Sequence, residues 1–145
     1  MATLSPDMQE LRYEALRRQA RQRLDVFEDV RAAARAKARG LTQREIADLL
    51  VTSQASVHRL LKTAERRGDV RVRMPEESIL DAFVNQAPRA SLIDELKRFP
   101  YTFGEDAPSP HEGRLPGSWD QVVSAFMQDF LSEEEFTEVR AAIGR

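Results

Sequence analysis

A short segment, residues 53–62, holds the side chains of this 145-residue chain whose types and spacing best fit a binding chemistry. Its polar, small and basic members are Ser53, Gln54, Ala55, Ser56, His58, Arg59 and Lys62. Gln54 can make two hydrogen bonds to adenine, Arg59 can do the same to guanine, and Ala55 can touch a thymine methyl group. Ser53 and Lys62 can reach phosphate oxygens. No acidic residue occurs from position 49 to position 64, so the segment predicts contact with double-stranded DNA rather than an ordinary solvated helix face.

Two short helices are expected to position these side chains. Thr42 and Glu45 can satisfy each other's free backbone amides, which begins the first helix. Ser53 begins the second helix as its N-cap, and Gly68 ends it. The apolar positions of the second helix are Val57, Leu60, Leu61 and Ala64. When these residues pack inward, the helical period turns the polar set of residues 53–62 outward.

The stretch GLTQREIADLLVTSQASVHRLLKTAERRG, residues 40–68, resembles the helix-turn-helix of bacterial DNA-binding transcriptional regulators. The resemblance covers about 25 residues, a sixth of the chain. It implies that the apolar contacts between the two helices are Ile46, Leu50, Val57 and Leu60. It also implies that Ala47 is the small residue that permits their close approach, and that the second helix reads DNA.

The turn between the two helices departs from the family pattern. The family places glycine and then an aliphatic residue there, whereas this chain has Val51 and Thr52. A β-branched residue at positive φ is costly. We therefore expect a reshaped turn or a slightly reoriented second helix.

Further basic residues lie beside the motif. Arg44, at the start of the first helix, is placed to contact a phosphate, and an exposed arginine without a partner is the alternative. Four arginines, Arg66, Arg67, Arg71 and Arg73, flank an apolar–basic alternation over residues 70–74 that predicts a short strand. They could reach a minor groove or phosphates, or serve as a solubilising fringe.

Net charge divides the chain into two halves of opposite sign. Residues 1–75 hold 16 basic and 10 acidic residues, a net charge of +6, and residues 76–145 hold 6 basic and 14 acidic residues, a net charge of −8. Halves of opposite sign indicate different partners, with the basic half facing a polyanion and the acidic half facing protein. Mutual attraction of the halves within one molecule is the alternative.

The composition argues against several other classes. The absence of cysteine excludes disulfide scaffolds, zinc fingers and cysteine nucleophiles. His58 and His111 have no metal-ligand spacing, and no glycine-rich phosphate loop or nucleophile elbow occurs. Glu133, Glu134 and Glu135 fit the first turn of a helix, where carboxylates are stabilising. With no apolar run long enough for a membrane span and no signal pattern, we expect a cytoplasmic protein that is not an enzyme and has no cofactor, metal or membrane association.

Helices are expected through most of the remaining chain. Residues 7–38 lack proline and glycine and carry one apolar stripe, and Gly40 follows as a C-terminal cap. Unbroken, that helix would span about 48 Å. We therefore expect a break near residues 24–26 or a first segment that packs against a second copy.

After residue 75, the patterns predict four shorter helices and one long connection. The first helix covers residues 76–86, and Ser91 with Asp94 caps the second. A loop follows at residues 100–117, which is either disordered or pinned by Tyr101 and Phe103. Capping pairs at Ser118/Gln121 and Ser132/Glu135 begin helices of residues 119–131 and 133–143, which form a hairpin.

The sequence thus predicts a mainly α fold in two parts. Residues 1–74 form an N-terminal helix with a helix-turn-helix DNA-binding domain, and residues 75–145 form a small, acidic helical region for interaction or dimerisation. The expected function is sequence-specific transcription regulation, as a repressor acting as a homodimer. One alternative is an antitoxin-type autorepressor whose residues 76–145 neutralise a protein partner. Another is a DNA-organising or segregation protein.

Overall fold

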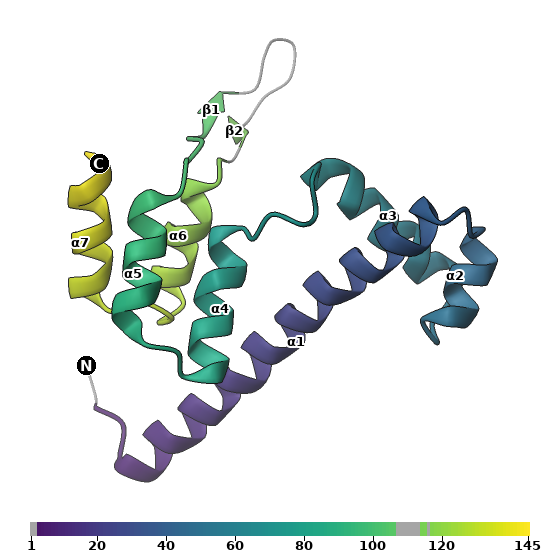
Figure 1. Ribbon diagram of the computed structural model, residues 1–145. Coiled ribbons are helices and arrows are strands. Elements are labelled where there is room, and N and C mark those ends of the chain that lie inside the picture. Colours follow the sequence, from purple (N-terminus) through teal and green to yellow (C-terminus); the bar gives the residue numbers. More distant parts are fainter. Residues whose placement is uncertain (1–2, 107–113, 116) are drawn as a thin grey trace. The chain divides into compact units, whose positions relative to one another are not determined.

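The computed structural model describes residues 3–106, 114–115 and 117–145, and it is mainly helical, as expected (Figure 1). The helices are α1 Pro6–Ala38, α2 Gln43–Leu49, α3 Gln54–Arg67, α4 Pro75–Asn85, α5 Arg89–Arg98, α6 Trp119–Met127 and α7 Glu133–Ile143. Two short strands, β1 Glu105–Asp106 and β2 Arg114–Leu115, pair antiparallel, with Glu105 opposite Leu115 and Asp106 opposite Arg114. They lie within the stretch expected to be a loop, part of which is outside the described residues. His111 also lies outside them.

The chain forms two compact units that differ from the expected division at residue 74. Residues 21–73 form one unit, and residues 1–20 join residues 74–145 in the other. The first, here called the basic unit, holds 13 basic and 7 acidic residues, a net charge of +6. The second, the acidic unit, holds 9 basic and 17 acidic residues, a net charge of −8. The charge division therefore follows the compact units.

Helix α1 contributes to both units without a break, so the interruption expected near residues 24–26 is wrong. No proline or glycine interrupts its 33 residues. Ala20 is fully buried in the acidic unit, and Val30 and Ala33 are buried in the basic unit. The helix is longer than a small domain requires because its two ends are buried in different units.

The basic unit is built on one small hydrophobic cluster. Its buried members are Ala33, Ala36, Ile46, Ala47, Val57 and Leu61, with Leu41, Leu50 and Leu60 packed against them. All five residues that the family resemblance assigned to the contact between α2 and α3 belong to this cluster. The end of α1 supplies the alanines, which allow the backbones of three helices to approach closely.

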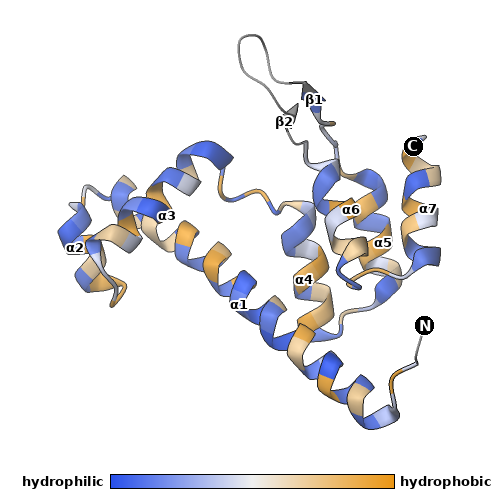
Figure 2. Ribbon diagram, turned by 180° about the vertical axis from the view of Figure 1, so that it is seen from behind, coloured by the Kyte–Doolittle hydropathy of each residue, from blue (hydrophilic) through white to orange (hydrophobic). Residues whose placement is uncertain are grey.

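The acidic unit packs α4 against α5 and α6, and α7 against α5 and α6. Hydrophobic residues on α4, α5 and α6 face one another (Figure 2). The largest fully buried side chains of this unit include Phe130, Ile79, Leu80, Leu96, Val122 and Val139. Trp119 on α6 stacks on Phe136 on α7, with ring centroids 5.9 Å apart. Helices α6 and α7 thus form the expected hairpin.

Helix starts follow the capping expectations in three cases. The reciprocal hydrogen bonds of a capping box are present between Thr42 and Glu45 and between Ser132 and Glu135. Ser53 accepts the Ser56 N–H at the start of α3, and Gly68 ends that helix at φ 75°. These local rules succeed where the capping residue has no competing partner.

Two expected caps are wrong because other contacts replace them. The Ser118 Oγ accepts the Thr102 N–H at 2.9 Å, and Asp120 accepts the Gly117 N–H at 2.7 Å in its place. Helix α5 begins at Arg89, directly after Pro88, so Ser91 lies inside the helix.

The expected helix of residues 119–131 is also shorter, because Asp129 at φ 68° turns the chain after Met127. Tyr101 pins the start of the long connection by donating to the Leu96 carbonyl at 2.6 Å.

The strand expected over residues 70–74 does not form. Asp69 organises a turn there, because its carboxylate accepts the Arg71 N–H at 3.0 Å and its carbonyl accepts the Val72 N–H at 3.2 Å. Arg31 on α1 donates to the Val70 carbonyl at 2.7 Å. The alternation of apolar and basic residues therefore reflects a turn held by side chains.

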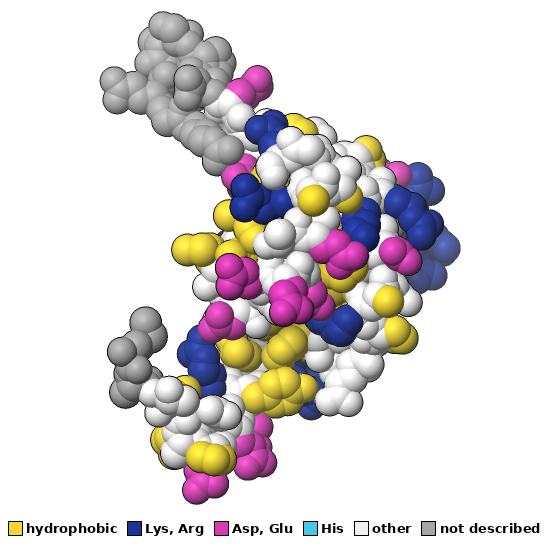
Figure 3. Space-filling model, turned by 90° about the vertical axis from the view of Figure 1, so that its left-hand side faces the viewer, with side chains coloured by type: hydrophobic (Ala, Val, Ile, Leu, Met, Phe, Trp, Pro, Cys, Tyr) yellow, Lys and Arg dark blue, Asp and Glu magenta, His cyan; other side chains and the backbone are white. Residues whose placement is uncertain are grey.

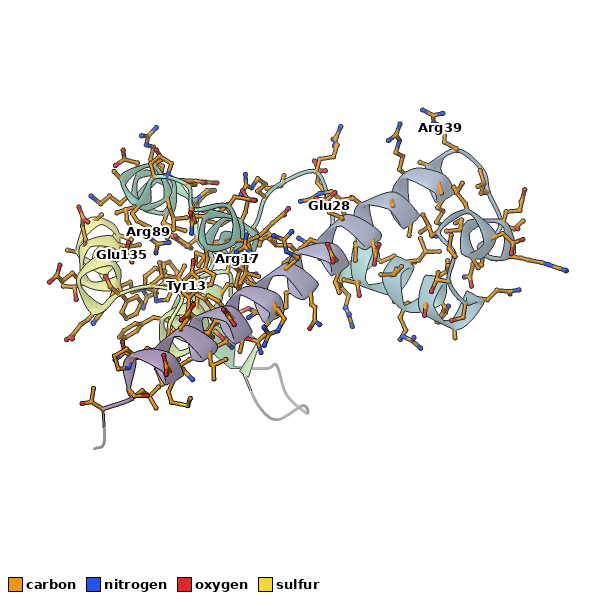
Figure 4. The ribbon with its side chains drawn as sticks, turned by 90° about the horizontal axis from the view of Figure 1, so that it is seen from below. Tyr13, Arg17, Glu28, Arg39, Arg89 and Glu135 are labelled. Atoms are coloured by element: carbon orange, nitrogen blue, oxygen red, sulfur yellow. The ribbon has the colours of Figure 1, made fainter. Side chains whose placement is uncertain are left out.

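A bidentate ion pair ties α5 to α7 in the acidic unit (Figure 4). Arg89 donates to the two carboxylate oxygens of Glu135 at 2.8 and 2.9 Å, and to the Phe130 carbonyl at 3.2 Å. Glu135 also accepts the Ser132 N–H at 2.9 Å. The hydrogen bond from Arg89 is the main reason that the pKa of Glu135 is held below its ordinary value of 4.5.

Glu135 should make the acidic unit acid-sensitive. A carboxyl group whose pKa is lowered by folding stabilises the folded state above its unfolded pKa, and this contribution is lost as pH falls below about 4.5. Glu135→Gln keeps the capping box but removes the charge, so it should lower stability at pH 7 by about 1 kcal/mol or less. Urea denaturation at pH 7 and pH 3.5 should show a larger loss of stability on acidification for wild type than for the variant. An equal loss in both would contradict this role for the ion pair.

Candidate nucleic-acid interface

The turn between α2 and α3 is short and holds a strained residue. Val51 adopts φ 57°, the left-handed region, and its side chain is 92% exposed. The Thr52 N–H donates to the Ala47 carbonyl at 2.9 Å and closes the turn. The expected conflict in this turn is thus present as a β-branched residue at positive φ.

The face of α3 that the sequence singled out lies at the surface of the basic unit. Val57 and Leu61 are buried, whereas the exposed residues of the predicted set are Ser53, Gln54, Ala55, His58, Arg59 and Lys62. Ser56 is half-buried, and Arg44, on α2, is exposed. The hydrophobic cluster beneath α3 therefore brings seven of the eight predicted residues onto one helix, with Arg44 on the neighbouring one.

A chain of hydrogen bonds connects the start of α3 to Arg59. The Ser53 hydroxyl donates to the Ser56 Oγ at 3.0 Å, and Arg59 donates to the same oxygen at 3.1 Å. Ser53 also accepts the Ser56 N–H at 3.1 Å. Two of the predicted contact residues thus hold a third, which restricts the Arg59 side chain to one region of the surface.

Lys62 is held only weakly. Its ammonium group lies 3.7 Å from a Glu65 carboxylate oxygen, and Lys37 on α1 lies 4.0 Å from the other oxygen of that carboxylate. All three side chains are more than half exposed. Exposed ion pairs of this kind contribute roughly 0–1 kcal/mol, so Lys62 can exchange Glu65 for a phosphate at small cost.

Beside Arg59 lies a hollow of about 320 Å³ that the motif did not predict. It is lined by Val26, Asp29, Leu50, Thr52, Ser56, Arg59, Leu60 and Thr63. The Thr63 hydroxyl donates to the Arg59 carbonyl at 3.0 Å and accepts from Arg66 at 3.2 Å. Asp29 comes from α1, outside the motif, and places an acidic group at the edge of the basic face. Its place could not be found from helix periodicity because it depends on how α1 packs.

The four flanking arginines are not equivalent. The Arg67 guanidinium lies over the Phe27 ring, 4.5 Å from its centroid, and packs α3 against α1. Arg71 pairs with Asp69, at 3.0 and 3.1 Å. Next to this turn is a groove of about 620 Å³ whose charged lining residues are Glu28, Arg31, Arg35, Asp69 and Arg71. Arg67 thus has a structural role, and the arginine closest to the turn is engaged with an acid.

Metal-ligand clusters and membrane spans were sought among the described residues. No group of three or more histidine, aspartate or glutamate side chains within residues 3–106, 114–115 and 117–145 could hold a metal ion. No helix in the same ranges is long and apolar enough to cross a membrane. No family model, curated protein or solved structure matches this chain.

Replacing Val51 with glycine should stabilise the basic unit. Relief of the left-handed strain is worth about 1–2 kcal/mol, and the greater freedom of glycine in the unfolded chain returns about 0.4–1 kcal/mol. The net gain should raise hydrogen-exchange protection of the Ile46 and Val57 amides by about two- to fivefold. The exposed side chain removes no packing.

Val51→Ala is the matched control, because alanine keeps the Cβ atom that causes the strain. It should raise protection less than glycine does, and the Leu96 amide in the acidic unit should not respond to either change. Equal effects of alanine and glycine would show that the backbone conformation is not the source of strain.

Proposed function

We propose that this chain is a sequence-specific DNA-binding transcriptional regulator, a repressor that acts as a homodimer in the cytoplasm, with α2 and α3 as its helix-turn-helix. One observation carries the proposal. Helix α3 presents an exposed set of polar and basic side chains, free of acids from residue 54 to residue 64, above apolar residues that are buried against α2. A helix with this division of faces fits a major groove.

The charge of the basic unit supports the same proposal. Neutralisation of phosphates by lysine and arginine supplies most of the sequence-independent affinity of DNA-binding proteins. The basic unit carries a net charge of +6, and the acidic unit carries −8. The acidic unit would repel phosphate, so DNA affinity is assigned to the basic unit.

The roles of the individual residues follow from their chemistry and position. Gln54 and Arg59 read base edges, and Ala55 contacts a thymine methyl group. Phosphates are contacted by Ser53, Lys62 and, from α2, Arg44. His58 contacts a base or a phosphate, and Ser56 orients Arg59 through the hydrogen bond between them.

Binding to DNA selected from a random pool tests the assignment. Arg59→Ala should weaken binding to the selected site by about 1–3 kcal/mol and weaken binding to random DNA less. Lys62→Ala should weaken binding to both alike and lower the slope of log K against log salt concentration by about 1. Fluorescence anisotropy at several salt concentrations measures both effects.

Arg98→Ala is the matched control for these variants. Arg98 lies on α5 of the acidic unit with its side chain 80% exposed, so its loss should leave binding unchanged. Equal loss of selected and random binding in Arg59→Ala would contradict base reading by Arg59. Failure of the wild-type chain to select any sequence would contradict the proposed function.

A groove in the acidic unit favours a second candidate, the antitoxin-type autorepressor. This groove, of about 620 Å³, has Tyr13, Phe83, Phe130 and Leu131 among its lining residues, with Arg89 and Glu135 beside them. On the side of the chain where α7 lies, hydrophobic side chains are exposed among acidic ones (Figure 3). Such a surface suits a protein partner that carries apolar and basic groups.

The second candidate is separated from the first by co-expression with the product of the neighbouring gene. An antitoxin should form a stable complex on size-exclusion chromatography with light scattering, and Tyr13→Ala should weaken it. A regulator without such a partner should elute alone. A DNA-organising protein should instead cover DNA continuously, so discrete footprints would exclude that reading.

A further inference from the structure

Helix α1 has two apolar faces, and the acidic unit covers only one of them. The covered face carries Tyr13, whose ring centroid lies 5.3 Å from that of Phe83, and Ala20, which is fully buried. Arg17, on the same side of α1, donates to the Val84 carbonyl at 3.2 and 3.3 Å. Tyr13 and Arg17 both point from α1 toward α4 (Figure 4).

The second apolar face lies on the opposite side of the helix. Leu4, just before α1, and Met8 are each 46% exposed, Leu11 is 55% exposed, and Ala15 is also exposed. Their spacing of four, three and four residues places them on one stripe, turned away from Tyr13 at about 100° per residue. This stripe, residues 4, 8, 11 and 15, is called the outer stripe. Exposed leucine and methionine aligned at helical spacing indicate a surface that another helix covers.

Charges along α1 indicate that the covering helix is a second α1. Acidic residues lie toward its start, at Asp7, Glu10 and Glu14, and a group of arginines follows at Arg17, Arg18, Arg21 and Arg23. Two copies that run antiparallel bring the acidic end of each helix against the basic end of the other. A helix of one uniform charge would repel its own copy, whereas this arrangement is self-complementary.

The positions of these charges suit a coiled-coil contact. Asp7 and Arg21 are fourteen residues apart, two heptads, and both lie along the same edge of the outer stripe. In an antiparallel pair, like edges face each other, so Asp7 of one copy faces Arg21 of the second copy, and this pair occurs twice. Leu11 then packs on Ala15 of the second copy, on either side of the two-fold axis.

We propose that two copies of this chain pair through an antiparallel contact between their α1 helices, made by Leu4, Met8, Leu11 and Ala15 and flanked by Asp7 and Arg21. The inference rests on the homodimer part of the proposed function, for which it supplies the interface. Two copies joined in this way carry two α3 helices, the number that a site with two half-sites requires.

Sedimentation velocity of the full chain without DNA tests the contact. The wild-type chain should sediment as a dimer, with twice the 16.5 kDa mass of one chain. Met8→Glu combined with Leu11→Glu should give a monomer with unchanged circular dichroism, because both side chains are already exposed. The matched control is Met127→Glu, since Met127 is a more exposed methionine at 76%, lies on α6, and should leave the dimer intact.

Exchange of the flanking charges tests the antiparallel direction. Asp7→Arg or Arg21→Asp alone should weaken the dimer by about tenfold, because each replaces two attractive pairs with two repulsive ones. The double variant should recover to within about twofold of wild type at low salt, because it restores both pairs with their signs reversed. Two additive losses in the double variant would overturn the proposed direction.

The outcomes separate this inference from the proposed function. A wild-type monomer, or a Met8→Glu/Leu11→Glu variant that remains dimeric, overturns the α1 contact whether or not the chain binds DNA. A dimer that depends on the outer stripe but selects no DNA sequence supports the contact and overturns the proposed function. Binding of the outer stripe to an unrelated protein in place of a second copy also overturns the inference.

Discussion

The burial of Val57 and Leu61 of α3 against Ile46 and Ala47 of α2 is the contact on which the surface of the basic unit depends. These residues, with Ala33 and Ala36 of α1, form a cluster that is small and entirely aliphatic. Because α3 has only one apolar side, its burial fixes which residues face solvent. The outward position of Gln54 and Arg59 is therefore a consequence of packing, and a change in the cluster would rotate the whole polar face.

Local patterns predicted the parts of this structure that local interactions decide. The capping boxes at Thr42 and Ser132 and the apolar spacing of α2 and α3 each require only neighbouring residues. They also placed seven of the eight predicted contact residues on the exposed or half-exposed side of α3 or at its cap. Periodicity could find them because one stripe of the helix is buried and the rest is not.

The errors in the sequence-based expectations share one cause, which is contact between distant parts of the chain. Ser118 bonds to Thr102 across the long connection, a partner that no local rule could supply. The turn at residues 69–72 depends on Arg31, which is 39 positions from the carbonyl that it bonds. The boundary at residue 74 separated Tyr13 from Phe83, although the first half of α1 packs with the acidic unit. The same dependence on distant packing hid the position of Asp29 beside Arg59.

The continuity of α1 connects these observations to the proposed activity. One half of the helix is part of the acidic unit, and the other supplies Ala33 and Ala36 to the cluster beneath α3. A helix without glycine or proline resists bending, so a contact made at residues 4–15 constrains the direction in which residues 30–38 leave. In a symmetric pair held by α1, the spacing of the two α3 helices would depend on this helix, on its packing against the cluster and on the register of the outer stripe. Selection for a fixed spacing between DNA half-sites would then explain why a chain of this size keeps an unbroken helix of 33 residues.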